Sequence, residues 1–274
     1  MRAVGTENAW FSFNGLRNDD ETLGVKMLSM PTRPHPARKG KLVDIPGAHG
    51  KLFQDEGVYD RILVSLRCIA PDNDNIDAVN AWLSGSGELI FGDEPNRAYH
   101  ARITKEFSRS NRNPRLRGQE FTVTFDCEPF RYRAKDTEKD EDTVYIVETN
   151  EGTVISQKKN NETIPLIGID NPGTVASAPM IIIDNTNNHA ANLNLSIGRY
   201  SMTVNITGNT KMRIDCDAKI AFTGEDTAAS PLVLATQHIF GDWIVIEPDF
   251  NTVLYTGDGI RGVNITIEPR WRWL

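Results

Sequence analysis

The chain has 274 residues and a net charge of −7, from 30 Lys and Arg side chains against 37 Asp and Glu. A hydrophobic share of 39% and a charged share of 24% are typical of a soluble globular protein and exclude an intrinsically disordered chain. The longest apolar run, Ala178–Ile183, is too short to span a bilayer, and Glu7 interrupts the place of a secretory signal, so we expect no membrane insertion. The three cysteines form no CxxC pair, which excludes a disulfide framework or a zinc ribbon.

Charge is distributed unevenly along the chain. Residues 1–135 carry 20 basic and 18 acidic side chains, whereas residues 136–274 carry 10 basic and 19 acidic ones. This difference favours two domains with different tasks. Residues 136–143 contain no large apolar side chain, and we interpret them as an exposed charged linker. The sequence therefore predicts a first domain over residues 1–135, a linker over residues 136–143 and a second domain over residues 144–274.

The first domain combines one helical pattern with several strand patterns. The helix is predicted from apolar residues at helical spacing, with a capping residue before them and a glycine after them: Asp74 or Asn75, then Ile76, Val79, Trp82 and Leu83, then Gly85. Apolar residues alternate with polar ones in Arg61–Ile69 and Phe121–Cys127. Glu88–Phe91 and Tyr99–Phe107 flank the turn residues Gly92–Asn96. We expect a sheet with one helix packed on it.

The second domain shows no helical period. Its short strand patterns are separated by Asn, Asp, Gly and Thr, which predicts an all-β sandwich or jelly roll. The predicted strands are Met180–Asp184, Leu193–Ile197, Met202–Ile206, Met212–Cys216, Ile220–Thr223, Trp243–Glu247, Thr252–Tyr255 and Val263–Trp273. In the last strand Val263, Ile265, Ile267, Trp271 and Trp273 share one parity, so we expect that face to be buried. The fold class predicted for the whole chain is mainly β.

No catalytic or metal-binding motif has the required spacing. The segment Gly47–Leu52 has glycines three apart rather than five and no Ser or Thr after its lysine, so it is not a phosphate loop. The five histidines are dispersed without an HxxH or HxxxH pair. Cys68 and Cys127 lie on apolar faces, which indicates inert core thiols. We predict that the chain is not an enzyme and has no cofactor or metal.

Two basic stretches are the remaining candidate sites. The first consists of Arg109, Arg112, Arg115 and Arg117, with no acidic residue between them, and the second of Arg33, Arg38, Lys39 and Lys41 in a Pro-rich stretch. Either stretch can be an ordinary solvated loop. Either can also be a phosphate-facing surface or a charged contact between subunits. Single-strand stacking is disfavoured, because no aromatic residues are interleaved with the arginines.

Short motifs in a fixed order then point to a family. In the first half they are Phe11–Gly15, Gly24-Val25, Ile45–Gly47 with Gly50, Leu66–Ile69, Ala81–Gly85, Glu88–Phe91, Asp93–Pro95, Tyr99, Ala101, Phe121–Phe125, Cys127 and Pro129-Phe130. In the second half they are Asn171–Thr174, Ala178-Pro179 and Arg270–Leu274. Over almost its full length the chain resembles the distal tail proteins of long-tailed phages (siphophages). One departure is Ala48-His49, where the family commonly has an arginine and a polar or acidic residue.

The resemblance implies a structural virion protein of the tail tip. It implies a homo-oligomeric ring, a hexamer, formed by the first domain, and a galectin-like second domain. The ring would join the tail-tube protein to the baseplate hub or tail-fibre protein, would let DNA pass, and would be assembled in the host cytoplasm. The four arginines Arg109, Arg112, Arg115 and Arg117 are then a candidate lumen or interface loop that faces phosphates without reading bases.

Two other functions stay open from the sequence. The second domain can be a carbohydrate-binding module for host adhesion, which predicts an aromatic side chain on a solvent-facing strand surface; Tyr200 and Trp243 are the candidates by parity. A hydrolase would need polar side chains gathered from distant strands, which a single sequence does not reveal.

Overall fold

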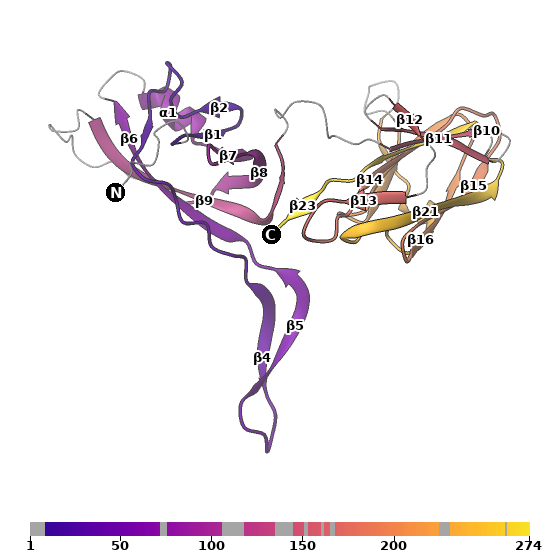
Figure 1. Cartoon of the computed structure of the whole chain (residues 1–274), viewed down its shortest axis with the longest axis horizontal. Helices are drawn as coiled ribbons and strands as arrows, with labels where there is room; N and C mark the ends of the chain where they lie inside the picture. Colours follow the sequence, from indigo (N-terminus) through magenta and orange to yellow (C-terminus); the bar gives the residue numbers. More distant parts are fainter. Residues whose placement is uncertain are drawn as a thin grey trace. The chain divides into compact units, whose positions relative to one another are not determined.

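A computed structural model of the protein describes residues 9–71, 76–105, 118–134, 145–150, 153–159, 162–164, 168–224, 231–260 and 262–274. The chain divides into two compact units, Met1–Thr137 with Leu274, and Glu138–Trp273. Both consist mainly of strands, as predicted (Figure 1). The predicted linker, residues 136–143, lies outside the described residues, so the proposed domain boundaries stay a prediction.

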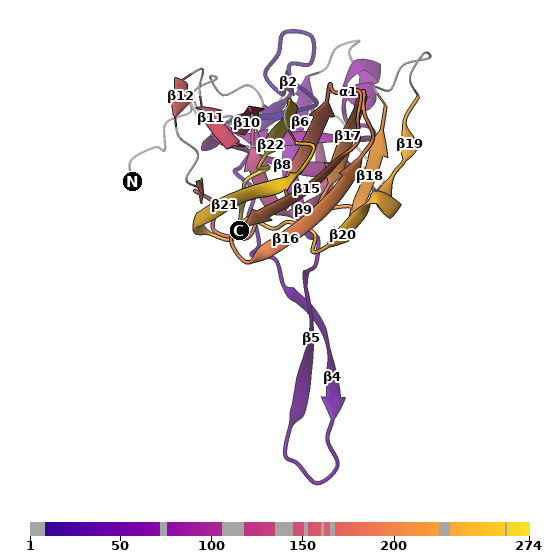
Figure 2. The same cartoon turned by 90° about the vertical axis from the view of Figure 1, so that its right-hand side faces the viewer.

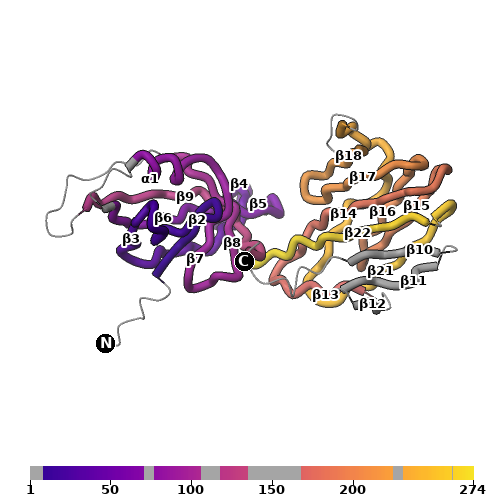
Figure 3. Tube along the Cα trace, turned by 90° about the horizontal axis from the view of Figure 1, so that it is seen from above, coloured from indigo at the N-terminus to yellow at the C-terminus, as the bar shows by residue number. Residues whose placement is uncertain are grey.

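Seven strands of the first unit form an antiparallel sheet in the order β2-β1-β7-β8-β9-β6-β3, seen from above in Figure 3. Their bounds are β1 Phe11–Phe13, β2 Leu16–Arg17, β3 Lys26–Met27, β6 Ile62–Pro71, β7 Ser86–Phe91, β8 Glu94–Ile103 and β9 Gly118–Arg133. The turn between β7 and β8 is shorter than predicted, because Glu94 already begins β8. Both edge strands, β2 and β3, are only two residues long, so the sheet has short open edges.

The α1 helix (Ile76–Trp82) covers one face of this sheet and completes the first core. Val79 and Trp82 are buried, the Trp82 ring stacks on Phe11 with centroids 5.3 Å apart, and its Nε1 donates to the Phe13 carbonyl oxygen at 2.8 Å. Gly85 follows the helix with φ +77°, the left-handed conformation that favours glycine. The predicted helix is confirmed, while its predicted caps Asp74 and Asn75 lie outside the described residues.

Two strands of the first unit leave this sheet and pair with each other. They are β4 (Arg38–Asp44) and β5 (Lys51–Tyr59), and they form a two-stranded hairpin, which we call the arm. Figures 1 and 2 show from two sides that the arm projects away from the sheet of the first unit. The interpretation of Arg38, Lys39 and Lys41 as part of a loop is therefore wrong, because all three lie on β4.

The second unit is a sandwich of two antiparallel sheets. One sheet has the order β12-β11-β10-β22-β14-β17-β18-β19, and the other the order β13-β21-β15-β16-β20. The bounds of the first sheet are β10 Tyr145–Asn150, β11 Thr153–Lys159, β12 Glu162–Ile164, β14 Met180–Asn185, β17 Thr210–Asp215, β18 Ile220–Thr223, β19 Val233–Leu234 and β22 Val263–Glu268. Those of the second are β13 Gly168–Asn171, β15 Ala191–Ile197, β16 Tyr200–Ile206, β20 Ile239–Gly241 and β21 Asp249–Asp258. A short 3-10 helix, η2 (Thr236–His238), precedes β20 in the chain, and the final strand, β23 (Arg272–Trp273), follows β22.

The inner faces of the two sheets form the second core. Ile181, Ile183 and Ile265 of one sheet are fully buried together with Leu193 and Ile197 of the other. The alternation in the sequence locates these residues correctly, which confirms the predicted β-sandwich. The predicted strand Trp243–Glu247 is wrong: this segment contributes only an isolated bridge between Ile246 and Ser177.

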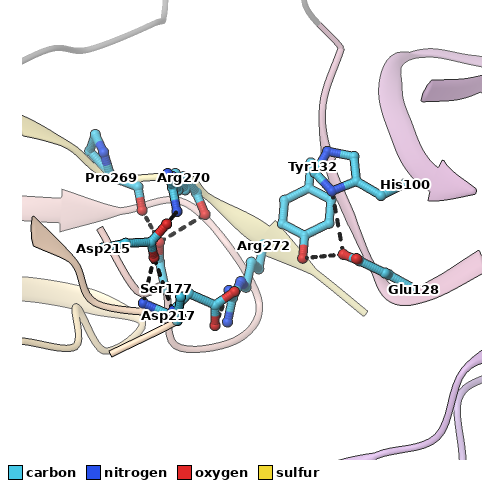
Figure 4. A network of polar contacts seen from close by, with 10 residues as sticks. His100, Glu128, Tyr132, Ser177, Asp215, Asp217, Pro269, Arg270 and Arg272 are labelled. Atoms are coloured by element: carbon cyan, nitrogen blue, oxygen red, sulfur yellow. Dashed lines mark hydrogen bonds and ion pairs between the residues drawn. The ribbon is translucent and has the colours of Figure 1, made fainter. Parts of the chain in front are cut away.

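The predicted strand Val263–Trp273 is interrupted, although its parity holds. Pro269 ends β22, because proline has no N–H to donate to a ladder, and Arg270 adopts φ +55°. Figure 4 shows how polar contacts hold this bend: the Ser177 hydroxyl donates to the Pro269 and Arg270 carbonyl oxygens, and Arg270 pairs with Asp215 at 3.0 Å. Trp271 and Trp273 are thereby returned to the buried face.

A buried asparagine ties the start of the chain to the first core. Asn18 Oδ1 accepts from the Phe11 backbone N–H at 2.7 Å, and Asn18 Nδ2 donates to the Val25 carbonyl oxygen at 2.8 Å. Asn18 is almost fully buried, so water does not replace these bonds. It therefore links β1 to the segment before β3.

We predict that Asn18→Ala lowers the free energy of unfolding of the first domain by about 2–4 kcal/mol, because it leaves a buried N–H and a buried carbonyl without partners. Calorimetry and urea unfolding measure the loss. Asn96→Ala is the matched control, an exposed asparagine in the same domain, with an expected change below about 0.5 kcal/mol. Equal stabilities of the two variants would contradict this role of Asn18.

Candidate functional site

The arm exposes apolar side chains on both of its faces. On one face Leu42 lies opposite Phe53, and on the other Val43 lies opposite Leu52. Their exposed fractions are 64% for Leu42, 46% for Phe53, 42% for Val43 and 56% for Leu52. A two-stranded ribbon has no second layer, so neither face is covered by the arm itself.

The Phe53 ring lies flat against the opposite strand because Gly40 has no side chain. A Cβ atom at Gly40 would lie 2.6 Å from Phe53 Cζ and 2.4 Å from the Gln54 carbonyl oxygen. The glycine thus lets the aromatic ring cover the backbone of β4. This packing fixes the ring while leaving half of its surface open to a partner.

Most charged side chains of the arm are paired along its length. Lys51 Nζ lies 3.2 Å from Asp44 Oδ2, Arg38 Nε lies 3.6 Å from Asp55 Oδ2, and Lys39 Nζ lies 3.7 Å from Glu56 Oε2. These pairs are exposed and contribute little to stability. They leave the arm nearly neutral, so its apolar side chains are what it offers to another surface.

The base of the arm is anchored to the first domain by ion pairs and aromatic contacts. Arg33, which precedes β4, pairs with Asp93, in the turn between β7 and β8, and with Glu94, the first residue of β8. Arg131 of β9 also binds Glu94, at 2.9 and 3.0 Å. At the end of β5 the Tyr59 ring packs edge-on against Phe130, with centroids 5.8 Å apart. These contacts tie both strands of the arm to the sheet.

A shared carboxylate joins two arginines near the start of β6. Asp126 Oδ1 accepts from Arg61 Nε at 2.7 Å, and Asp126 Oδ2 accepts from Arg102 Nε at 3.0 Å. Burial alone would raise the pKa of Asp126, but the hydrogen bonds and charges of the two arginines outweigh it and lower this pKa below its usual value. The carboxylate therefore stays ionised and holds three strands together.

A second polar cluster adjoins it on the same sheet (Figure 4). The His100 and Tyr132 rings stack with centroids 4.2 Å apart, and both bind Glu128 Oε2, from His100 Nδ1 at 3.3 Å and from the Tyr132 hydroxyl at 3.0 Å. The bond from His100 lowers the pKa of Glu128, against the effect of burial. His100 and Glu128, together with Arg61 and Arg102, line an open cleft of about 680 Å³, in which positive and negative groups already pair with each other.

The structure locates only some of the residues singled out in the sequence. Arg109, Arg112, Arg115 and Arg117 lie outside the described residues. Cys68, Cys127 and Cys216 are buried and unpaired as disulfides, and burial raises the pKa of each thiol to about 12, which fits inert core residues. Across the described ranges no group of three His, Cys, Asp or Glu side chains is placed to hold a metal ion, and no helix there is long and apolar enough to cross a membrane.

In the second domain the solvent-facing aromatic side chains differ from the expected ones. Tyr200 and Trp243 are half-buried and pack against the second core. Among the described side chains of the second domain, the exposed aromatic ones are instead Phe240, exposed at 53%, and Phe250, exposed at 59%. Phe250 has the parity of the outward-facing residues of β21, so the alternation of the sequence carries a signal for its exposure.

The sequence and the fold were compared with known proteins. Residues 21–127 match the family model of the phage tail protein RIFT-related domain, a segment that contains the arm, the helix and the strands that anchor them. No curated protein matches the chain.

Among solved structures, the chain is similar to the Dit (gp 19.1) protein of phage SPP1, described as a paradigm of the hub adsorption apparatus in phages that infect Gram-positive bacteria. The TM-score is 0.59 at 16% identity, over 97% of this chain and 99% of that one. A chain of the phage P2 baseplate, in its activated conformation with Ca, gives a TM-score of 0.43 at 8% identity over 89% of each chain, too low to argue from. The predicted resemblance to distal tail proteins is confirmed by the domain match and by the shared fold.

We predict that Asp126→Asn destabilises the first domain by about 1–2 kcal/mol at neutral pH, because it removes the charged acceptor of two arginines. The pKa of Asp126 is lowered in the folded state. The ionised carboxylate therefore stabilises the fold at pH values above its pKa in the unfolded chain, near 3.9, and this stabilisation is lost as the pH falls through its pKa in the folded state. The difference between the variant and the parent should therefore shrink below about pH 4.

Calorimetry at several pH values measures this difference. Asp44→Asn, which removes an exposed ion pair of the arm, is the matched control with little expected effect. A deficit of Asp126→Asn that keeps its full size in acid would contradict the assignment.

Proposed function

We propose that the chain is a structural protein of a phage tail tip, whose first domain assembles into a hexameric ring that joins the tail tube to the baseplate hub or tail fibre and lets DNA pass. The match of residues 21–127 to a phage tail domain supports the tail location. The number six and the two neighbouring proteins follow from the resemblance to distal tail proteins. In this proposal the role is structural and not enzymatic, and assembly takes place in the host cytoplasm.

The main support for the proposed ring is the exposed apolar surface of the arm. Leu42 and Phe53 on one face and Val43 and Leu52 on the other are exposed side by side, which is unfavourable in water on a ribbon without a core. Further apolar residues, Ile45 at the tip and Val58 near the base, are also exposed. Both faces therefore need a partner surface.

The partner we propose is a second copy of the chain. The body of the first domain exposes apolar residues of its own: Leu16 on edge strand β2, Leu28 and Met30 after edge strand β3, and Leu63 on β6. The ion pairs of the arm are internally compensated, so a nearly neutral apolar surface of this kind suits it better than a strongly charged one. Because the arm of one copy would contact the body of the next, the contact is head-to-tail, and such contacts close into rings when the rotation permits.

The four arginines of residues 109–117 complete the proposal as the phosphate-facing loop of the ring. On the described face of the sheet the arginines already have acidic partners, as Arg61 and Arg102 with Asp126 and Arg67 with Glu120 show. The sequence places no acidic residue among Arg109, Arg112, Arg115 and Arg117. A cluster of basic side chains attracts a phosphate backbone without sequence preference.

We predict that the purified full chain forms a closed ring of six, seen by light scattering and negative-stain electron microscopy. The double variants Leu42→Ser with Phe53→Ser, and Val43→Ser with Leu52→Ser, should each shift the population to monomers, because each removes one apolar face of the arm. Leu254→Ser, at an equally exposed leucine of the second domain, is the control and should leave the ring intact. A parent chain that remains monomeric at all concentrations, or arm variants that assemble like the parent, would refute the proposal.

We predict that replacing Arg109, Arg112, Arg115 and Arg117 together by Glu impairs ring assembly or DNA release in phage particles that carry the variant. Replacing the same four residues by Lys keeps the charge and should preserve both functions, since non-specific phosphate contacts do not require guanidinium geometry. Tail morphology and the release of DNA from virions are measured. If the Glu variant assembles and releases DNA like the parent, the arginine loop does not face phosphates or a subunit contact.

A further inference from the structure

Three adjoining cavities lie at one end of the sandwich, where the β17–β18–β19 side of one sheet approaches β16 and η2 of the other. The first has about 700 Å³, the second about 200 Å³ and the third about 280 Å³. The first and second share Thr210, Thr223 and Val233 as lining residues. The second and third share Asn205, Thr207 and His238. Each neighbouring pair of cavities thus shares lining residues, and we call the three together the end groove.

Neutral hydrogen-bonding side chains dominate the lining of the end groove. The side chains of Asn205, Gln237 and His238 form no hydrogen bond with any part of the chain that the structure describes, so their polar side-chain atoms are available to a ligand. The Thr207 and Thr210 hydroxyls bind each other at 2.7 Å, and each retains a further lone pair. The groove thus offers amide, imidazole and hydroxyl groups over a short distance.

Apolar side chains lie next to these polar groups. Met212 is buried and lines the second cavity, and Val233 and Leu234 line it with more than half of their surfaces exposed. A surface that combines a few convergent polar groups with apolar contacts is typical of small-molecule sites. Sugars match it, since their rings present C–H patches edged by hydroxyl groups.

The charges of the groove are balanced. Lys211 and Asp184 line the first cavity and are direct cross-strand partners on β17 and β14, so their charges compensate each other. Asp258 is the charged residue of the third cavity. Residues 136–274, with 10 basic and 19 acidic side chains, also repel anions. Phosphate, sulfate and carboxylate ligands are therefore disfavoured.

The loops around the groove are held in place before any ligand arrives. Asn185, which is fully buried, donates to the Thr207 carbonyl oxygen at 3.1 Å and to the His189 carbonyl oxygen at 3.0 Å. Asn209 Nδ2 donates to Asn188 Oδ1 at 2.8 Å. A site that is ordered in advance loses less conformational entropy when it binds.

We propose that the end groove is a binding site for an uncharged saccharide, a function beyond the ring and independent of it. Asn205 and Gln237 would hydrogen-bond sugar hydroxyls, and Val233 and Leu234 would contact the C–H face of a ring. Asn205 and Gln237 are exposed and do not support the core, so both can be replaced without loss of the fold.

The test uses the full chain and an array of neutral oligosaccharides built from glucose, galactose, rhamnose and N-acetylglucosamine, followed by NMR titration with the sugars that bind. We expect a dissociation constant near or below about 1 mM. Asn205→Ala and Gln237→Ala should each weaken binding about three- to tenfold, the effect of one neutral hydrogen bond. Phe250→Ser, on an exposed aromatic residue of the same domain outside the groove, should leave the affinity unchanged.

Several outcomes overturn this proposal. They are the absence of binding to any neutral oligosaccharide at about 10 mM, binding to anionic glycans alone, and unchanged affinity of both Asn205→Ala and Gln237→Ala. Loss of binding in Phe250→Ser with normal binding in Asn205→Ala would move the site to the outer sheet face. The arm variant Leu42→Ser with Phe53→Ser separates this proposal from the ring, because it should lose assembly and keep the same affinity per chain.

Discussion

A ribbon of two strands has no interior, and this constraint governs the first domain. A fully exposed Leu, Phe or Val side chain gains on the order of 1.5–3 kcal/mol when it is fully buried. Leu42, Phe53, Val43 and Leu52 are still 42–64% exposed, so roughly half of this gain remains for each, and the arm cannot realise it within its own single layer. A second surface that covers both faces, as in the proposed ring, would remove these side chains from water. The remainder of the first domain fixes the position of the arm, which has no core of its own.

The contacts at the base of the arm show how this task is met. Glu94 receives Arg33 from the segment before β4 and Arg131 from β9, so one carboxylate ties the arm to the centre of the sheet. The sheet is in turn fixed by a core in which Trp82 stacks on Phe11 and donates to the Phe13 carbonyl oxygen. The direction in which the arm leaves the domain is therefore set by packed and hydrogen-bonded groups rather than by a free loop.

The sequence predicts elements that bury one face and fails where no face is buried. The helical spacing of Val79 and Trp82 and the alternation of Ile181 and Ile183 both arise from burial of one face. The helix and the strand that contain these residues, α1 and β14, lie where the sequence predicts them. In the arm apolar residues occupy both parities, as Leu42 beside Val43 and Leu52 beside Phe53 show, so the pattern of a half-buried strand is lost. The end groove has no signal in the sequence for another reason: Asn205 and Thr223 lie on strands of different sheets and Gln237 lies in η2, so only the packing of the two sheets brings them to one cavity.

The two proposed functions depend on separate sets of interactions. The second core is built from its own two sheets, and its loops are fixed locally by buried asparagines such as Asn171, Asn185 and Asn251, which bind backbone groups of neighbouring turns. The end groove is lined by Asn185 and its partner Thr207 in the second domain, while the arm and its anchoring ion pairs belong to the first domain. Substitutions in the groove can therefore change a ligand without loosening the assembly surface. If both proposals hold, the arm surface can stay unchanged for its contacts within the particle while the residues of the end groove change with the surface of the host.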